Sequence, residues 1–91
     1  MNDEEREELL TFLAGNPEAG LSLGGGLRKV RFARSGGGKS GGYRTIYVFG
    51  GSEVPLFLVT VFAKNEKSNL SAKELAAAIE LSKRLLKEYG V

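Results

Sequence analysis

Six basic residues and no acidic residue lie between positions 23 and 49 of this 91-residue chain. Three of them, Lys29, Arg31 and Arg44, sit in the short segments "LRKVRF" and "YRTIYVF", which alternate as β-strands do. Like charges at this density repel one another unless an anion lies among them. The pattern therefore predicts a polyanionic partner, most simply nucleic acid.

These three residues could cleave RNA, because RNA has its own nucleophile in the 2′-hydroxyl. Cleavage needs a base for that hydroxyl, positive charge at phosphorus and an acid for the departing 5′-oxygen. Arginine stays protonated and its planar fork suits a phosphorane, so Arg31 and Arg44 are the candidates for charge stabilisation. A lysine crowded by cations gives up its proton more readily, so Lys29 is the candidate base.

Further candidates for RNA contact have a basic or aromatic side chain near these three. They are Arg28, Arg34, Lys39, Tyr43, Lys64 and Lys67. The basic residues among them are also consistent with solvated strand ends or ordinary loop charges. Tyr43 or Tyr47 could stack on a base, although we expect Tyr47 to pack in the sheet with its hydroxyl at the rim.

The segment "ARSGGGKSGG", residues 33–42, is close to the phosphate loop of nucleotide-binding proteins. A phosphate loop requires a helix to begin at the Lys-Ser pair, whereas here two glycines and a run of strand formers follow Ser40. We therefore predict a hairpin loop. Its glycines would let the backbone approach a phosphodiester that Lys39 and Arg34 neutralise, or it would serve only as a soluble connector.

The composition excludes several kinds of catalytic and metal-binding side chain. The chain has no histidine and no cysteine, so the commonest general base, disulfides and thiolate metal sites are all missing. We expect no metal and no cofactor. The N-terminal segment has no signal-peptide pattern and no apolar run reaches membrane-spanning length, so we expect a soluble cytoplasmic protein that does not bind membranes.

The periodicity predicts one α+β domain over residues 1–91. Helices are predicted over residues 2–14 and 71–89, the second with a capping box formed by Ser71 and Glu74. Strands are predicted over 27–34, 43–50 and 54–63, with residues 21–26 as a loop. We expect these three strands to form an antiparallel meander, with 54–63 as a central strand and both helices on one face.

The strings "LRKVRFA", "GKSGGYR" and "FAKNE" resemble those of the RelE/HigB-like toxins of toxin–antitoxin pairs, and the similarity covers nearly the whole chain. The resemblance implies a compact α+β fold and an endoribonuclease that cuts messenger RNA in the ribosomal A site without a metal. The family's cationic motif residues match Lys29, Arg31 and Arg44. A further basic residue of relatives has its nearest counterparts in Lys64 and Lys67.

The resemblance also implies a cognate antitoxin, often one with a helix-turn-helix, that holds the toxin inactive. The exposed cations suggest an acidic or strand-adding segment on that partner, because a bare sheet edge invites strand addition. Two features depart from the family pattern. No strand precedes the first helix, so either the sheet lacks that edge strand or the start is truncated. Near the place of a family tyrosine stands Ser71, so that tyrosine's proton-transfer role does not transfer.

Two other readings use the same residues. A non-catalytic RNA-binding module would use the cations for phosphate contacts alone. A degenerated toxin would only bind its antitoxin and would not slow growth on its own.

Overall fold

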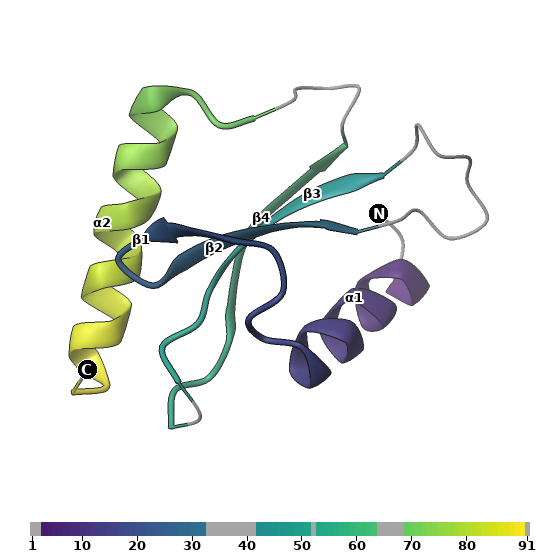
Figure 1. Cartoon of the computed structure of the whole chain (residues 1–91), viewed down its shortest axis with the longest axis horizontal. Coiled ribbons are helices and arrows are strands. Elements are labelled where there is room, and N and C mark those ends of the chain that lie inside the picture. The colour runs from purple at the N-terminus through teal and green to yellow at the C-terminus, as the bar shows by residue number, and fades with distance from the viewer. Residues whose placement is uncertain (1–2, 33–41, 52, 64–68, 91) are drawn as a thin grey trace.

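The computed structural model of the chain describes residues 3–32, 42–51, 53–63 and 69–90 (Figure 1). In chain order its elements are α1 (Asp3–Gly15), β1 (Leu21–Gly24), β2 (Leu27–Phe32), β3 (Tyr43–Val48), β4 (Phe57–Ala63) and α2 (Ala72–Glu88). The strands form one antiparallel sheet in the order β1-β2-β3-β4. The fold is therefore α+β with a meander, as predicted, but with four strands rather than three. No helix within the described ranges is long and apolar enough to cross a membrane.

β1 is the strand that the sequence did not predict, so the prediction of a loop over residues 21–26 is wrong. Leu21 and Ser22 pair with Lys29 and Arg28 of β2. The glycines that follow, at positions 24, 25 and 26, all have positive φ angles (101°, 62° and 87°). Glycine adopts this conformation without a steric penalty, so the chain can turn sharply into β2. β1 thus forms the edge of the sheet beside β2.

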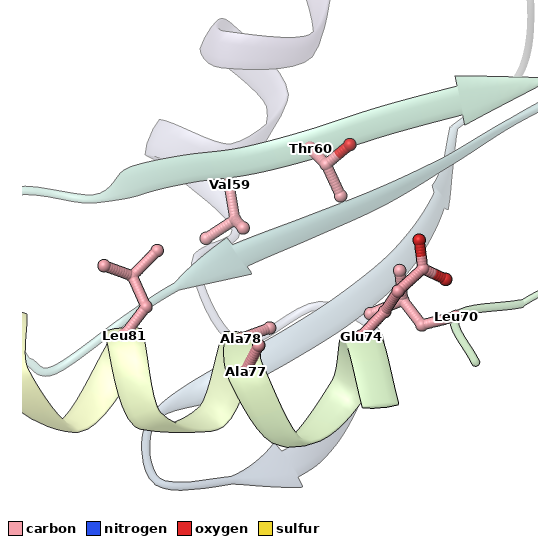
Figure 2. Close-up of a pocket in the computed structure, with 7 residues that line it drawn as sticks. All are labelled: Val59, Thr60, Leu70, Glu74, Ala77, Ala78 and Leu81. Atoms are coloured by element: carbon pink, nitrogen blue, oxygen red, sulfur yellow. The ribbon is translucent and has the colours of Figure 1, made fainter. Parts of the chain in front are cut away.

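The two helices lie on opposite faces of the sheet (Figures 1 and 2), so the prediction that both cover one face is wrong. The buried residues of the α2-side cluster are Leu27, Ile46, Val48, Phe62 and Ala78. The buried residues of the α1-side cluster are Leu9, Leu13, Val30 and Tyr47. Because successive strand residues point to opposite faces, a sheet covered on both sides needs apolar residues at successive positions, as β3 and β4 have.

β4 is an edge strand and β3 is central, so the prediction of a central strand over residues 54–63 is also wrong. The apolar run in β4 has another cause. Phe57 and Val59 pack against the α2-side cluster, while Leu58 and Val61 pack against the α1-side cluster. An edge strand between two helical layers is as apolar as a central one.

α2 begins with the predicted capping box. The Glu74 backbone N–H donates to Ser71 Oγ (3.1 Å), and the Ser71 N–H donates to Glu74 Oε1 (2.9 Å). Farther along, the Ser82 hydroxyl donates to the Gly25 carbonyl at 2.6 Å. A Cβ at Gly26 would lie only 2.4 Å from the nearest carbon of Leu86. The second half of α2 is therefore packed closely on the β1–β2 turn.

Candidate nucleic-acid interface

Lys29, Arg31 and Arg44 lie on the same face of the sheet. In the β2–β3 ladder Arg31 pairs directly with Arg44, and Lys29 pairs with Ile46. Directly paired residues share a face, and Ile46 belongs to the α2-side cluster, so all three cations are on the α2-side face. Paired side chains have Cβ atoms about 5 Å apart, and residues two apart in one strand are about 7 Å apart. One phosphodiester could contact all three side chains.

The α2-side cations have no carboxylate partner among the residues that the structure describes. Two arginines directly opposite each other on adjacent strands destabilise the sheet when nothing neutralises them. The Arg44 Nε is buried and has no hydrogen-bond acceptor within the described part of the chain. A buried donor of this kind is satisfied when an anion binds, so the geometry suits phosphate.

Arg31 and Arg44 lie toward one end of this face, whereas Lys29 lies opposite Ile46 of the α2-side cluster. α2 packs near the start of β2, at Leu27, and near the end of β3, at Val48. Arg31 and Arg44 lie toward the opposite ends of the same two strands. Arg31 is exposed, and Lys29 and Arg44 are half-buried. Within the described residues, this end of the face therefore exposes Arg31 fully and Lys29 and Arg44 in part.

Arg28 lies on the other face, although it is next to Lys29 in the sequence. It pairs with Tyr47 of the α1-side cluster. Its Nη2 donates to the carbonyls of Glu18 (2.7 Å) and Gly20 (3.2 Å) in the segment that joins α1 to β1. Because this guanidinium is engaged by the backbone and faces away from Lys29, we leave Arg28 out of the proposed site.

The two tyrosines of β3 also belong to the α1-side face. Tyr43 pairs with Phe32 and is only 5% exposed, so its ring is not presented beside the cations and we leave it out of the site as well. Tyr47 packs in the sheet as expected, but it is fully buried, so its hydroxyl does not lie exposed at the rim. Its hydroxyl lies 2.6 Å from the Ala19 carbonyl and 2.9 Å from that of Pro17. Burial raises the pKa of Tyr47 above its ordinary value of 10.0, and Arg28 opposes this shift.

Four of the predicted RNA contacts lie outside the described residues. They are Arg34, Lys39, Lys64 and Lys67. The described residues on either side of the glycine-rich segment bear on its interpretation: β2 and β3 pair antiparallel, and a strand begins at Tyr43. At Tyr43 the described chain is therefore a strand and not the helix that a phosphate loop requires, which agrees with the hairpin interpretation.

An apolar groove that the sequence did not indicate lies between α2 and β4, with a volume of about 330 Å³ (Figure 2). Its lining includes Val59 and Thr60 of β4 and Ala77 and Leu81 of α2. A possible signal was Leu81, a leucine of α2 whose side chain is 45% exposed. Nothing in the sequence alone sets that residue beside β4.

The described residues form a small antiparallel sheet between two helices, and within them Lys29, Arg31 and Arg44 share one face without a carboxylate partner. Residues 8–89 match the family model described as the RelE toxin of the RelE/RelB toxin–antitoxin system. The match covers most of the chain, so the protein belongs to the RelE toxin family. It is therefore a toxin of a toxin–antitoxin system, and that class of protein has an antitoxin as its partner.

Proposed function

We propose that this toxin is a metal-independent endoribonuclease that cleaves messenger RNA in the ribosomal A site. The observation that best supports this activity is the direct pairing of Arg31 with Arg44 on one face, with Lys29 beside them. Such an arrangement opposes folding unless a ligand relieves it, and a phosphodiester is a ligand of matching charge and size. Membership of the toxin family supports messenger RNA as the source of that phosphodiester.

In the proposed reaction the 2′-oxygen of the RNA attacks the adjacent phosphorus. Lys29, in its neutral form, takes the proton of the 2′-hydroxyl. Arg31 and Arg44 stabilise the negative charge that develops on the phosphorane oxygens. The bond from phosphorus to the 5′-oxygen then breaks and leaves a 2′,3′-cyclic phosphate. The departing 5′-oxygen takes up a proton, a step that we assign to no side chain of this face.

A non-catalytic RNA-binding module is the second candidate, and one observation favours it. The residue near the place of the family tyrosine is Ser71, whose hydroxyl already accepts the Glu74 N–H as the N-cap of α2. A serine hydroxyl holds its proton more tightly than a tyrosine phenol does, and the cap fixes its orientation, so Ser71 is a poor proton donor to RNA. The cations alone would then bind RNA without cutting it.

Ribosomes programmed with a defined messenger RNA separate these candidates. With the wild-type toxin, primer extension is expected to stop at the A-site codon, and induction in cells is expected to arrest growth. Arg44→Ala should reduce cleavage by about 10²–10³-fold, which is the typical effect of removing one charge-stabilising donor. Growth arrest should disappear while the protein stays folded by circular dichroism.

The matched control is Arg84→Ala, which removes an exposed arginine of α2 that belongs to neither the cation face nor the α1-side contacts. It should leave both cleavage and growth arrest unchanged. Binding of RNA with no stop at the A site would assign the protein to the non-catalytic class. Equal toxicity of Arg44→Ala and the wild type would remove Arg44 from the site.

A further inference from the structure

The groove of Figure 2 lies on the same face of the sheet as the proposed RNA site. Thr60 pairs with Ile46, and Ile46 pairs on its other side with Lys29, so these residues form one row across the sheet. The neighbouring row contains the pair of Arg31 and Arg44. Because directly paired residues share a face, the β4 wall of the groove and the three cations lie on one side of the sheet.

The separation between Thr60 and the cations corresponds to the span of one nucleotide. Lys29 is two strands away in the same row, which places it about 10 Å from Thr60 for strands about 4.8 Å apart. Arg44 is one strand away and two positions along, which places it about 8 Å from Thr60. A phosphate held by Arg44 therefore leaves a base attached to it within reach of the groove.

The lining of the groove suits the flat face of a nucleobase. Its walls include Val59 and Thr60 from β4 and Ala77 and Leu81 from α2. Ala77 and Leu81 are exposed, so apolar surface faces solvent in the free protein. The volume of about 330 Å³ lies within the range of about 300–1,000 Å³ that is usual for small-ligand sites. A base could enter the groove without displacing a packed core residue.

The aromatic side chains near the cations do not offer a base another place to stack. Proteins that bind single-stranded RNA usually hold an unstacked base against an aromatic ring. Here Tyr43 and Tyr47 belong to the α1-side face. Phe62, which pairs with Arg44, is on the cation side but is only 8% exposed. Among the described residues, the groove is therefore the apolar surface beside the cations that a base can reach.

We propose that the groove between α2 and β4 binds the base of a nucleotide that flanks the phosphodiester held by Arg31 and Arg44. The base packs between the β4 wall and the α2 wall. Apolar contact of this kind accepts any base, because every base has an apolar face, and the Thr60 hydroxyl can both donate and accept a hydrogen bond. The inference rests on the proposed RNA site and adds to it the residues that hold the base.

The test measures binding of the full-length toxin to ribosomes whose messenger RNA carries 2′-O-methyl groups in the A site, so that no 2′-hydroxyl can attack. Ala77→Leu fills the groove at an exposed position of α2. The matched control is Ala76→Leu, at the neighbouring exposed position, which does not line the groove. Both variants should stay folded by circular dichroism. We expect Ala77→Leu to weaken binding by about tenfold or more, and Ala76→Leu to change it by less than about twofold.

Removal of the base from the RNA identifies what the groove holds. Each of the two bases that flank the scissile bond is removed in turn, and both variants are measured again. For one of these abasic RNAs, Ala77→Leu should bind within about twofold of the wild type, because the group that it displaces is already missing. An equal effect of Ala77→Leu on the intact RNA and on both abasic RNAs would overturn the proposal. Equal binding of Ala76→Leu and Ala77→Leu to the intact RNA would also overturn it.

Cross-linking of the wild-type complex gives a readout that does not depend on any variant. A 4-thiouridine at the same flanking position should cross-link to the peptides that contain Val59 and Thr60 or Ala77 and Leu81. Cross-links to α1 or β1 instead would overturn the proposal. Arg44→Ala in the binding assay separates this inference from the proposed function. If Arg44→Ala weakens binding and Ala77→Leu does not, the base site alone is wrong, whereas a wild-type toxin that does not bind programmed ribosomes would overturn both.

Discussion

Arg28 and Arg44 lie on adjacent strands of one sheet, yet they face opposite sides of it and have different neighbours. Arg28 faces α1, and its Nη2 donates to two backbone carbonyls of the segment between α1 and β1. Arg44 faces the α2 side opposite another arginine. Both Nε atoms are buried without an acceptor among the described residues, so the difference lies in the terminal nitrogens and the neighbours. Arg28 connects the segment between α1 and β1 to the sheet, whereas Arg44 lies directly opposite another positive charge.

This difference teaches that strand parity, not local charge density, separates the proposed functional cations from the structural one. "LRK" places Arg28 and Lys29 next to each other in the sequence, and the pleat of β2 then sends them to opposite faces. A surface charge that is destabilising for the free protein is a reasonable mark of a binding site, whereas a charge satisfied by its own backbone is not.

The largest effect on cleavage is expected from reversing the charge of Arg44 on the α2-side face. Arg44→Glu would turn the opposed arginine pair into an ion pair with Arg31, so cleavage should fall by more than the roughly 10²–10³-fold expected for removing a single donor. The same change should raise the free energy of unfolding by about 0.2–1 kcal/mol, the usual range for a cross-strand pair. Single-turnover cleavage and urea unfolding of the same preparation measure both effects. A variant that is inactive and also less stable would contradict the claim that these two arginines oppose folding.

On the α1 side we expect a substitution to lower stability and to leave cleavage nearly unchanged. Arg28→Ala would leave the carbonyls of Glu18 and Gly20 without their donor, and the free energy of unfolding should fall by about 1–2 kcal/mol, since the site is only half-buried. Cleavage should stay within about twofold of the wild type at temperatures where the variant is folded. Unfolding by urea, with cleavage assayed in parallel, checks this prediction. An Arg28→Lys control should recover part of the stability, because lysine can donate to one carbonyl.

A smaller effect is expected from Tyr47→Phe, which removes a hydroxyl that contacts the Pro17 and Ala19 carbonyls. The free energy of unfolding should fall by about 1 kcal/mol near neutral pH. Burial raises the pKa of Tyr47 in the folded state above 10.0. The contribution of the neutral hydroxyl is therefore complete below about pH 10 and is lost as the pH rises through the higher folded value.

The stability of Tyr47→Phe should consequently depend less on pH above 10 than that of the wild type does. Urea unfolding at several alkaline pH values compares the two proteins directly. If the wild type and Tyr47→Phe lose stability in parallel above pH 10, the buried hydroxyl of Tyr47 does not cause that loss.

Short-range patterns in the sequence were enough to predict the elements that are set by interactions between residues close in the sequence. The capping box of α2 and the three longer strands were predicted because caps, turn glycines and β-branched runs act over a few residues. β1 was missed because four residues between glycines give almost no periodicity, and its pairing with β2 is set by three consecutive positive-φ glycines.

The layering of the fold was harder to predict, because it depends on which elements meet in space. The apolar run of β4 suggested a central strand, although coverage by α1 and α2 on two faces produces the same pattern at an edge. The pairing of Arg31 with Arg44 depended on the register of β2 against β3, across a segment whose length alone does not fix it. Membership of the RelE toxin family was predicted from motif strings and is confirmed over residues 8–89.

The most direct measurement is the single-turnover cleavage rate on programmed ribosomes for Arg44→Ala and Arg28→Ala, each assayed under conditions where the protein is folded. The account predicts that Arg44→Ala is about 10²–10³-fold slower than Arg28→Ala, whose rate stays near that of the wild type. Equal rates for the two variants, or a slower Arg28→Ala, would contradict the claim that the α2-side face holds the active cations.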